Sequence, residues 1–149
     1  MVLGGAVHRT VVAASWAALL IVAVGCGVGT PRAAADNPVC SQTWCAFLSP
    51  SRNISCELDY RRGGGIPDET YCQSMSPPQS VHMSPDGVFE RCAGESCLGN
   101  AGQGTPTLPY GQTAGLGPFS CRSEESGISC TVTSGRGFTI SNAGIAPAG

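Results

Sequence analysis

The sequence predicts a small all-β domain, made of antiparallel hairpins and a C-terminal β-meander that about four disulfides hold together. Apolar residues alternate with polar ones in short runs bounded by Gly, Pro, Ser and Asn, which is typical of half-buried strands. Leu, Ile, Val and Phe supply only 18 of the 114 residues from position 36 onward, too few for a large apolar core. The same region holds eight of the nine cysteines, an even number that disulfides can use completely.

The first predicted hairpin joins a short strand at 47–48 to a strand at 54–60 through a turn at 49–53 that contains proline and serine. Side chains alternate along the second strand, with Ile54, Cys56, Leu58 and Tyr60 on one face and Ser55, Glu57 and Asp59 on the other. A glycine-rich segment at 61–65 leads to a strand at 70–75. We interpret it as a flexible connector; an anion-binding loop is the alternative, because amides in glycine-rich turns can bind phosphate.

A second hairpin joins residues 81–83 to residues 88–92. Its turn is Ser84-Pro85-Asp86-Gly87, in which proline presets the second position and glycine accepts the positive φ that follows.

The C-terminal region from 119 to 141 predicts a three-stranded meander. With Glu125-Ser126 at the centre of the first turn, one face pairs Cys121 with Cys130, Phe119 with Val132 and Ser123 with Ile128. A turn at 134–137 then leads into a strand at 138–141. Residues 36–141 are therefore predicted to form one disulfide-rich domain, followed by a flexible tail at 142–149 that has few side chains able to dock it.

Residues 1–35 have the layout of a signal peptide, with a weakly basic start and an uncharged stretch from 10 to 25. We favour cleavage after Ala33-Ala34-Ala35, which gives a secreted protein. The alternative is a lipobox ending at Cys26, which would leave a lipid anchor on the outer face of the cell membrane. Both place the protein outside the cytoplasm, with membrane contact only through this segment or the lipid.

The charge balance from position 36 onward excludes the usual nucleic-acid interface. Six arginines and no lysine face ten carboxylates, a net charge of about −4. No basic patch remains for counterion release, so we expect no nucleic-acid partner, and we expect a monomer.

The remaining cysteines are predicted to be structural. We favour two disulfides within hairpins, one between Cys56 and Cys72 and one between Cys121 and Cys130. The others pair among themselves, either within each short loop or by tying the N-terminus to the second hairpin; these are Cys40, Cys45, Cys92 and Cys97. In a reducing compartment these four cysteines could bind zinc. Because the chain carries an export signal, we favour disulfides. No metal and no cofactor are predicted.

Five motifs in order resemble a family of small, cysteine-rich exported proteins of actinobacteria, especially mycobacteria, whose function is unknown. They are Ser49-Pro50-Ser51-x-Asn53-Ile54-x-Cys56, Leu108-Pro109-Tyr110-Gly111, Gly117-Pro118-Phe119-x-Cys121-x-Ser123, Ser126-Gly127-Ile128-x-Cys130 and Gly135-x-Gly137-Phe138-x-Ile140-Ser141. The resemblance implies export and a β-rich fold and transfers no catalytic residue. Arg52 stands where the family usually has a glycine in the turn.

Few residues outside the cysteines suggest chemistry. Glu57 and Asp59 project from one strand face about 7 Å apart, a spacing that a glycosidase pair permits, although nothing nearby in the sequence indicates a cleft. His82 is the one histidine after position 35, and we interpret it as a solvent-facing polar residue. The aromatic residues able to line a groove are expected to serve mainly in the core; they are Trp44, Tyr60, Tyr71 and Tyr110.

The sequence therefore favours a non-enzymatic exported module, with no catalytic residue, that binds an unknown protein or cell-envelope ligand through a rigid β surface. The alternatives are a small envelope hydrolase that uses Glu57 and Asp59, and an inhibitor of an extracellular enzyme.

Overall fold

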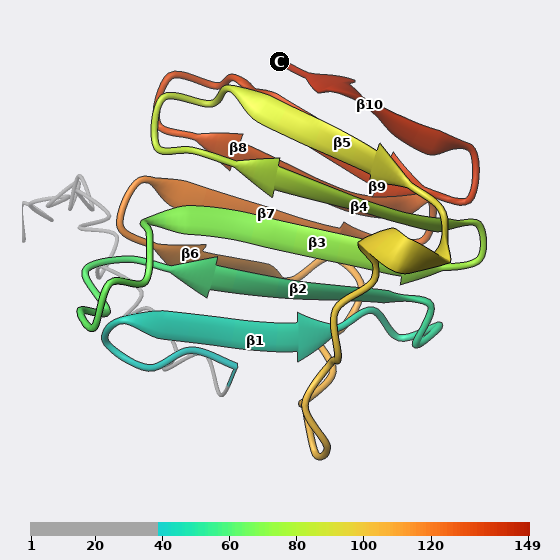
Figure 1. The fold of residues 1–149 in the computed structure, drawn as a ribbon, viewed down its shortest axis with the longest axis horizontal. Helices are drawn as coiled ribbons and strands as arrows, with labels where there is room; N and C mark the ends of the chain where they lie inside the picture. Colours follow the sequence, from blue (N-terminus) through green and yellow to red (C-terminus); the bar gives the residue numbers. More distant parts are fainter. Residues whose placement is uncertain (1–38) are drawn as a thin grey trace, which may run out of the picture. The chain divides into compact units, whose positions relative to one another are not determined.

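The computed structural model describes residues 39–149, which form two five-stranded antiparallel sheets with a shared core (Figure 1). Sheet A consists of β1 (Trp44–Leu48), β2 (Ile54–Asp59), β3 (Glu69–Met75), β4 (Pro78–Met83) and β5 (Phe89–Ala93). Sheet B consists of β6 (Thr113–Leu116), β7 (Phe119–Glu124), β8 (Gly127–Val132), β9 (Gly137–Ser141) and β10 (Gly144–Ala148). Each sheet is a meander in which every strand pairs with its neighbours in the chain. The all-β prediction is confirmed, whereas the signal segment and Cys26 lie outside the described residues.

The predicted register of the first hairpin in the C-terminal meander, formed by β7 and β8, is confirmed. Cys121 lies opposite Cys130, Phe119 opposite Val132, and Ser123 opposite Ile128. These side chains are buried, while Ser120 and Arg122, which alternate with them, are exposed. The meander is larger than expected, because β6 adds to one edge and β10 to the other.

Residues 142–149 were expected to form a flexible tail, and this expectation is wrong. Residues 144–148 pair with β9 along its whole length, from Gly144 opposite Ser141 to Ala148 opposite Gly137. The physical reason is that the backbone ladder of an edge strand needs no large side chains, so the apolar-poor sequence of β10 does not prevent docking.

Two disulfides lie in the core, where they face each other across the sheets. Cys56 is joined to Cys72 between β2 and β3, and Cys121 to Cys130 between β7 and β8. The four cysteines are at most 3% exposed, and the sulfur atoms of Cys72 and Cys130 are 3.8 Å apart. Disulfide sulfurs carry no hydrogen, so this is a van der Waals contact between the two bridges.

The other two disulfides close short loops, joining Cys40 to Cys45 and Cys92 to Cys97. This is the first of the two pairings that the sequence left open. Multiple disulfides are typical of extracytoplasmic proteins. Among residues 39–149, no helix has the length and apolar character needed to cross a membrane.

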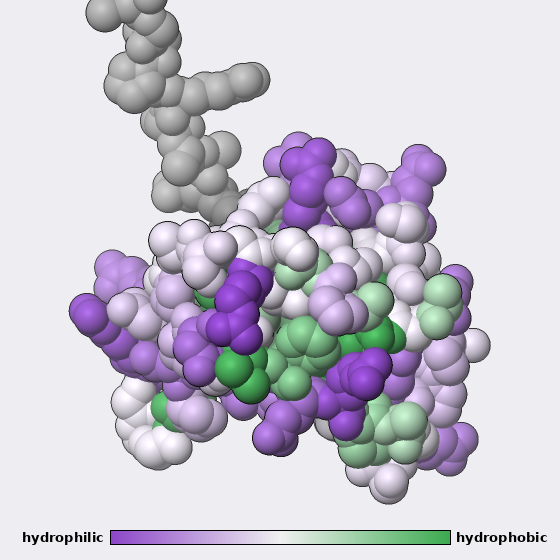
Figure 2. All heavy atoms as spheres, turned by 90° about the horizontal axis from the view of Figure 1, so that it is seen from above, coloured by the Kyte–Doolittle hydropathy of each residue, from purple (hydrophilic) through white to green (hydrophobic). Residues whose placement is uncertain are grey.

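The edge formed by β5 and β10 gathers apolar side chains between polar ones (Figure 2). Val88, Phe89 and Pro147 line a shallow groove of about 370 Å³ there. The guanidinium of Arg91 on β5 donates a hydrogen bond to the carbonyl of Ile145 on β10, which joins the two edges. Proline and charged side chains on these two edge strands oppose their pairing with another chain, and the monomer stays a prediction.

Arg52 occupies the position where a glycine was anticipated, and it adopts the glycine conformation, with φ of 59°. Left-handed backbone costs a non-glycine residue roughly 1–2 kcal/mol, which a glycine does not incur. Glycine is also more flexible in the unfolded chain, and this entropy cost cancels part of the gain. We therefore expect Arg52→Gly to raise the free energy of unfolding by about 0.5–1 kcal/mol in urea titrations. Arg52→Ala keeps the strained backbone and should leave stability nearly unchanged. Equal effects of the two substitutions would contradict the strain argument.

Candidate functional site

The outer face of sheet A brings together polar side chains that are far apart in the sequence. The strand register places Glu57 opposite Tyr71 and Tyr71 opposite His82, so these three residues form a row across β2, β3 and β4. The next row places Asp59 opposite Glu69. The predicted alternation along β2 is confirmed, since Glu57 and Asp59 share this face while Ile54, Cys56 and Leu58 are buried.

Arg62 holds the two predicted carboxylates together. Its Nη1 atom donates hydrogen bonds to Glu57 Oε1 at 2.8 Å and to Asp59 Oδ1 at 2.7 Å. Because both oxygens contact the same nitrogen, they can be no more than about 5.5 Å apart, the two distances together. Arg62 belongs to the segment whose alternative reading was an anion-binding loop. The Arg62 cation is engaged by these carboxylates, while anion binding by the backbone amides of residues 61–65 stays an untested alternative.

Trp44 completes this group from the adjoining strand β1. Its indole Nε1–H donates a hydrogen bond to Glu57 Oε1, and the Arg62 guanidinium carbon lies 5.3 Å from the indole ring centroid, within cation–π range. Trp44 was expected to serve in the core, and this expectation is wrong, as it is for Tyr71 and Tyr110. Only Tyr60 of the four aromatics considered packs against the core. The core instead takes its bulk from three phenylalanines and from cystine sulfur; the phenylalanines are Phe47, Phe119 and Phe138.

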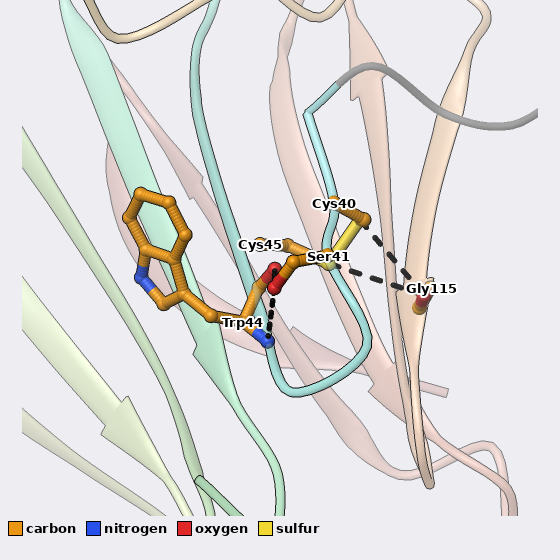
Figure 3. The surroundings of a disulfide bond; sticks show 5 residues. All are labelled: Cys40, Ser41, Trp44, Cys45 and Gly115. Atoms are coloured by element: carbon orange, nitrogen blue, oxygen red, sulfur yellow. Dashed lines mark hydrogen bonds between the residues drawn. A yellow bond between two sulfur atoms is a disulfide. The ribbon is translucent and has the colours of Figure 1, made fainter.

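The Cys40–Cys45 disulfide positions Trp44 (Figure 3). The loop that it closes returns Ser41 to Trp44, whose backbone N–H donates to the Ser41 hydroxyl at 3.2 Å while its carbonyl accepts from the Ser41 backbone N–H at 2.7 Å. The two sulfurs lie 4.0 and 3.9 Å from the carbonyl oxygen of Gly115 on β6. Since a disulfide has no S–H, these dashed contacts in Figure 3 are van der Waals packing, and they seat the start of β1 against sheet B.

His82 is paired rather than simply solvated. Its Nδ1 atom lies 3.1 Å from Glu69 Oε2, and its ring centroid lies 4.6 Å from that of Tyr71. The His82 side chain is about half exposed. Sequence reasoning missed this pair because Glu69 and His82 are 13 residues apart and meet only through the register of β3 with β4.

A segment that we call the strap, residues 94–107, carries the chain from sheet A to sheet B across this outer face (Figure 1). It begins with a short 3-10 helix, η1 (Glu95–Cys97), which the Cys92–Cys97 disulfide joins to β5. The Gly99 N–H donates to Gln73 Oε1 at 2.6 Å and to the Tyr71 hydroxyl at 3.0 Å, and the Gly99 carbonyl accepts from Gln73 Nε2 at 3.2 Å. The strap is thus fixed to the sheet by one covalent bond and several hydrogen bonds.

Two hollows adjoin the strap, and Glu57 and Tyr71 line both of them. The first, of about 320 Å³, also contacts Trp44, Gln73 and the strap at residues 100–106. The second, of about 520 Å³, contains the charged groups Asp59, Arg62, Glu69 and His82 together with residues 96–99. The sequence indicated no cleft beside Glu57 and Asp59. The structure corrects this, because the strap that builds the walls comes from a distant part of the chain.

Comparisons with protein-family models, with curated proteins and with solved structures find no match. The chemistry of this face therefore has to be argued from its own residues.

Burial raises the pKa of the Asp59 carboxyl group. Its side chain is 9% exposed, and this burial raises the pKa above the ordinary value of 3.8 despite the opposing hydrogen bond from Arg62. The nearby negative charges of Glu57 and Glu69 add to the increase in the pKa. Asp59 therefore retains its proton at a higher pH than an exposed aspartate does.

This shift predicts a specific pH dependence of stability. Because the folded state binds the Asp59 proton more tightly than the unfolded state, its stabilising contribution is present below pH 3.8 and is lost as the pH rises through the folded-state pKa. In urea titrations at a series of pH values, the stability of the wild type relative to Asp59→Asn should fall with rising pH across that window. Ser126→Ala, at an exposed turn, removes no titratable group and is the control, which should show no such trend. An opposite slope would show that Arg62 outweighs burial.

A metal site in the core is not supported by the chemistry of its sulfurs. The Cys56, Cys72 and Cys130 sulfur atoms lie within 4.8 Å of one another, but all three belong to disulfides and lack the thiolate charge that metal binding needs. Within residues 39–149, the outer face of sheet A is the strongest candidate site, since it combines hollows, aromatic rings and charged groups.

Proposed function

We propose that the protein is an exported, non-enzymatic binding module of the cell envelope that holds its ligand on the outer face of sheet A. The observation that carries this proposal is the pair of adjoining hollows between the strap and the sheet. Trp44 supplies a large, stiff aromatic surface there, and the disulfide-anchored strap keeps the walls in place, so little ordering cost is expected on binding. Release by cleavage after Ala35 is the favoured export route, with a lipid anchor on Cys26 as the alternative.

The contacts of the carboxylates favour binding over catalysis. The Glu57 carboxylate accepts hydrogen bonds from Trp44 and Arg62, and the Asp59 carboxylate accepts one from Arg62. The oxygen lone pairs that accept these hydrogen bonds are not available to a substrate until Arg62 or Trp44 moves away.

The binding proposal is tested with fractionated bacterial cell envelope and the exported form of the protein. Trp44→Ala should weaken binding by at least about tenfold, as removal of a central aromatic contact usually does. Tyr110→Ala is the matched control, because Tyr110 is 41% exposed and lines neither hollow. Unchanged binding by Trp44→Ala, or equal loss in both variants, would show that the outer face of sheet A is not the binding site.

One observation keeps the hydrolase as a second candidate. The Glu57 and Asp59 oxygens lie no more than about 5.5 Å apart, a limit that is compatible with the roughly 5–5.5 Å carboxyl spacing of retaining glycosidases. The raised pKa of Asp59 suits a general acid, and Glu57 would then be the nucleophile. Loss of a cell-wall-degrading activity in both Glu57→Gln and Asp59→Asn, with thermal unfolding unchanged, would replace the binding proposal with this one.

A further inference from the structure

The second hollow already contains a cation from the protein itself. The Arg62 guanidinium lies between the Glu57 and Asp59 carboxylates and within cation–π range of the Trp44 ring. From this arrangement we infer that the hollow is a binding site for a guanidinium group on an external ligand, and that Arg62 is an internal occupant which the ligand displaces. The inference rests on the proposed binding function and names the ligand class for the same face.

The charges of the hollow complement a cation once Arg62 has left. Glu57, Asp59 and Glu69 line it, and besides Arg62 the other basic side chain in its lining is His82. Without Arg62, two carboxylate oxygens no more than about 5.5 Å apart would repel each other, one of them on a side chain that is nine-tenths buried. An external cation relieves this repulsion as Arg62 does. Carboxylates alone would not identify a ligand. The hollow limits its size, and the Trp44 ring provides a flat surface on which a cation can stack.

The geometry favours a guanidinium over an ammonium group. Arg62 reaches Glu57 and Asp59 through a single nitrogen, Nη1, and an ammonium nitrogen could make the same two hydrogen bonds. The preference comes from the indole wall, because the guanidinium carbon of Arg62 also lies 5.3 Å from the Trp44 ring centroid. A planar, weakly hydrated guanidinium stacks on an aromatic face more readily than a compact, strongly hydrated ammonium group does. A hollow of about 520 Å³ has room for the group and the aliphatic chain that carries it.

The segment that carries Arg62 is built to let it leave. Gly63, Gly64 and Gly65 all have positive φ, and the structure places no atom within 4 Å of where a Cβ would stand on any of them. Arg62 itself is 35% exposed, so its side chain can turn into solvent without breaking core contacts. The neighbouring backbone is held separately, by the hydrogen bond from the Arg61 N–H to Asp68 Oδ1. Displacement therefore exchanges one cation for another, and it costs the two hydrogen bonds of Arg62 and its cation–π contact with Trp44.

The test is a titration with ethylguanidinium, followed by the indole N–H resonance of Trp44 at pH 8, above the usual titration range of imidazole. Arg62→Ala should bind ethylguanidinium at least about tenfold more tightly than the wild type, because the competing side chain is gone. Arg61→Ala is the matched control, since it removes an equal charge from the same segment, but Arg61 lies over the Tyr60 ring at 5.0 Å and not between the carboxylates. It should bind like the wild type.

Further titrations distinguish a guanidinium from an ammonium ligand, and a protein partner from a small molecule. Ethylammonium should bind Arg62→Ala at least about fivefold more weakly than ethylguanidinium, and Glu57→Gln in the Arg62→Ala background should abolish the gain. A preference for N-acetyl-arginine amide over ethylguanidinium assigns the group to a protein partner, and equal binding assigns a small molecule. If Arg62→Ala is too unstable to study, Arg62→Gln takes its place.

Two results would overturn the inference: no gain in Arg62→Ala over the wild type, or an equal gain in Arg61→Ala. Either would leave Arg62 as a structural clamp. The envelope assay with Trp44→Ala and Tyr110→Ala is independent of these titrations, so failure of the ligand class and failure of the binding function remain distinguishable.

Discussion

Replacing both cysteines of either core disulfide with alanine is expected to lower the free energy of unfolding by about 4 kcal/mol. The Cys56–Cys72 and Cys121–Cys130 bridges span sequence separations of 16 and 9, and closing loops of that size contributes about 3 kcal/mol in the chain-entropy model. Both bridges are buried, so removing two sulfur atoms also leaves a cavity that costs about 1 kcal/mol. Urea titration of each double variant measures the loss.

The Cys92–Cys97 bridge provides the control, since it closes a shorter loop with a separation of 5 and Cys92 is exposed. Its replacement by alanine lacks the cavity penalty and should cost about 2 kcal/mol. If the core pairs cost no more than this surface pair, burial of the sulfurs contributes nothing to stability.

The two core bridges should not act independently. The Cys72 and Cys130 sulfurs are in contact at 3.8 Å, so loss of one bridge removes packing from the other. The combined variant is expected to lose about 6–8 kcal/mol, comparable with the whole stability of a small domain. It should therefore be largely unfolded at 37 °C, which circular dichroism would report.

The contrast between the β7–β8 hairpin and β10 shows what the sequence could predict. From 119 to 132 each residue has its own reason for its place: a two-residue turn, alternating burial, and cysteines that must face each other. Residues 144–148 give no such signal, because β10 docks through backbone hydrogen bonds to β9 that any sequence without further prolines could make.

The candidate site divides in the same way. Glu57 and Asp59 were predicted to share a face because they are two residues apart on one strand. The contacts of Arg62 and Trp44 with them, and the pairing of Glu69 with His82, depend on how strands and connectors meet in space. The hollows depend on the strap, whose path across sheet A is set by the Cys92–Cys97 bridge and by hydrogen bonds to Gly99. Periodicity carries no information about such a crossing.

Gly137→Ala is expected to cost about 3 kcal/mol or more, because no side chain fits where β9 meets β8. A Cβ at this position would overlap the carbonyl oxygen of Cys130 and lie 2.8 Å from the Cα of Thr131. Both obstructing atoms belong to the backbone, so relief requires a shift of β8 or β9 and the loss of ladder hydrogen bonds. The shift would also disturb Cys130 and, through it, the contact between the core disulfides.

Gly115→Ala separates this steric effect from the general effect of glycine in a strand. Gly115 lies in β6, and its Cβ would meet only the Phe119 carbonyl oxygen, at 3.6 Å. That substitution should leave stability unchanged or raise it slightly, since alanine is less flexible than glycine in the unfolded chain. Thermal unfolding of both variants distinguishes the cases: a similar loss in each would point to strand glycines in general, whereas a loss confined to Gly137→Ala places the constraint at the close approach of β8 and β9.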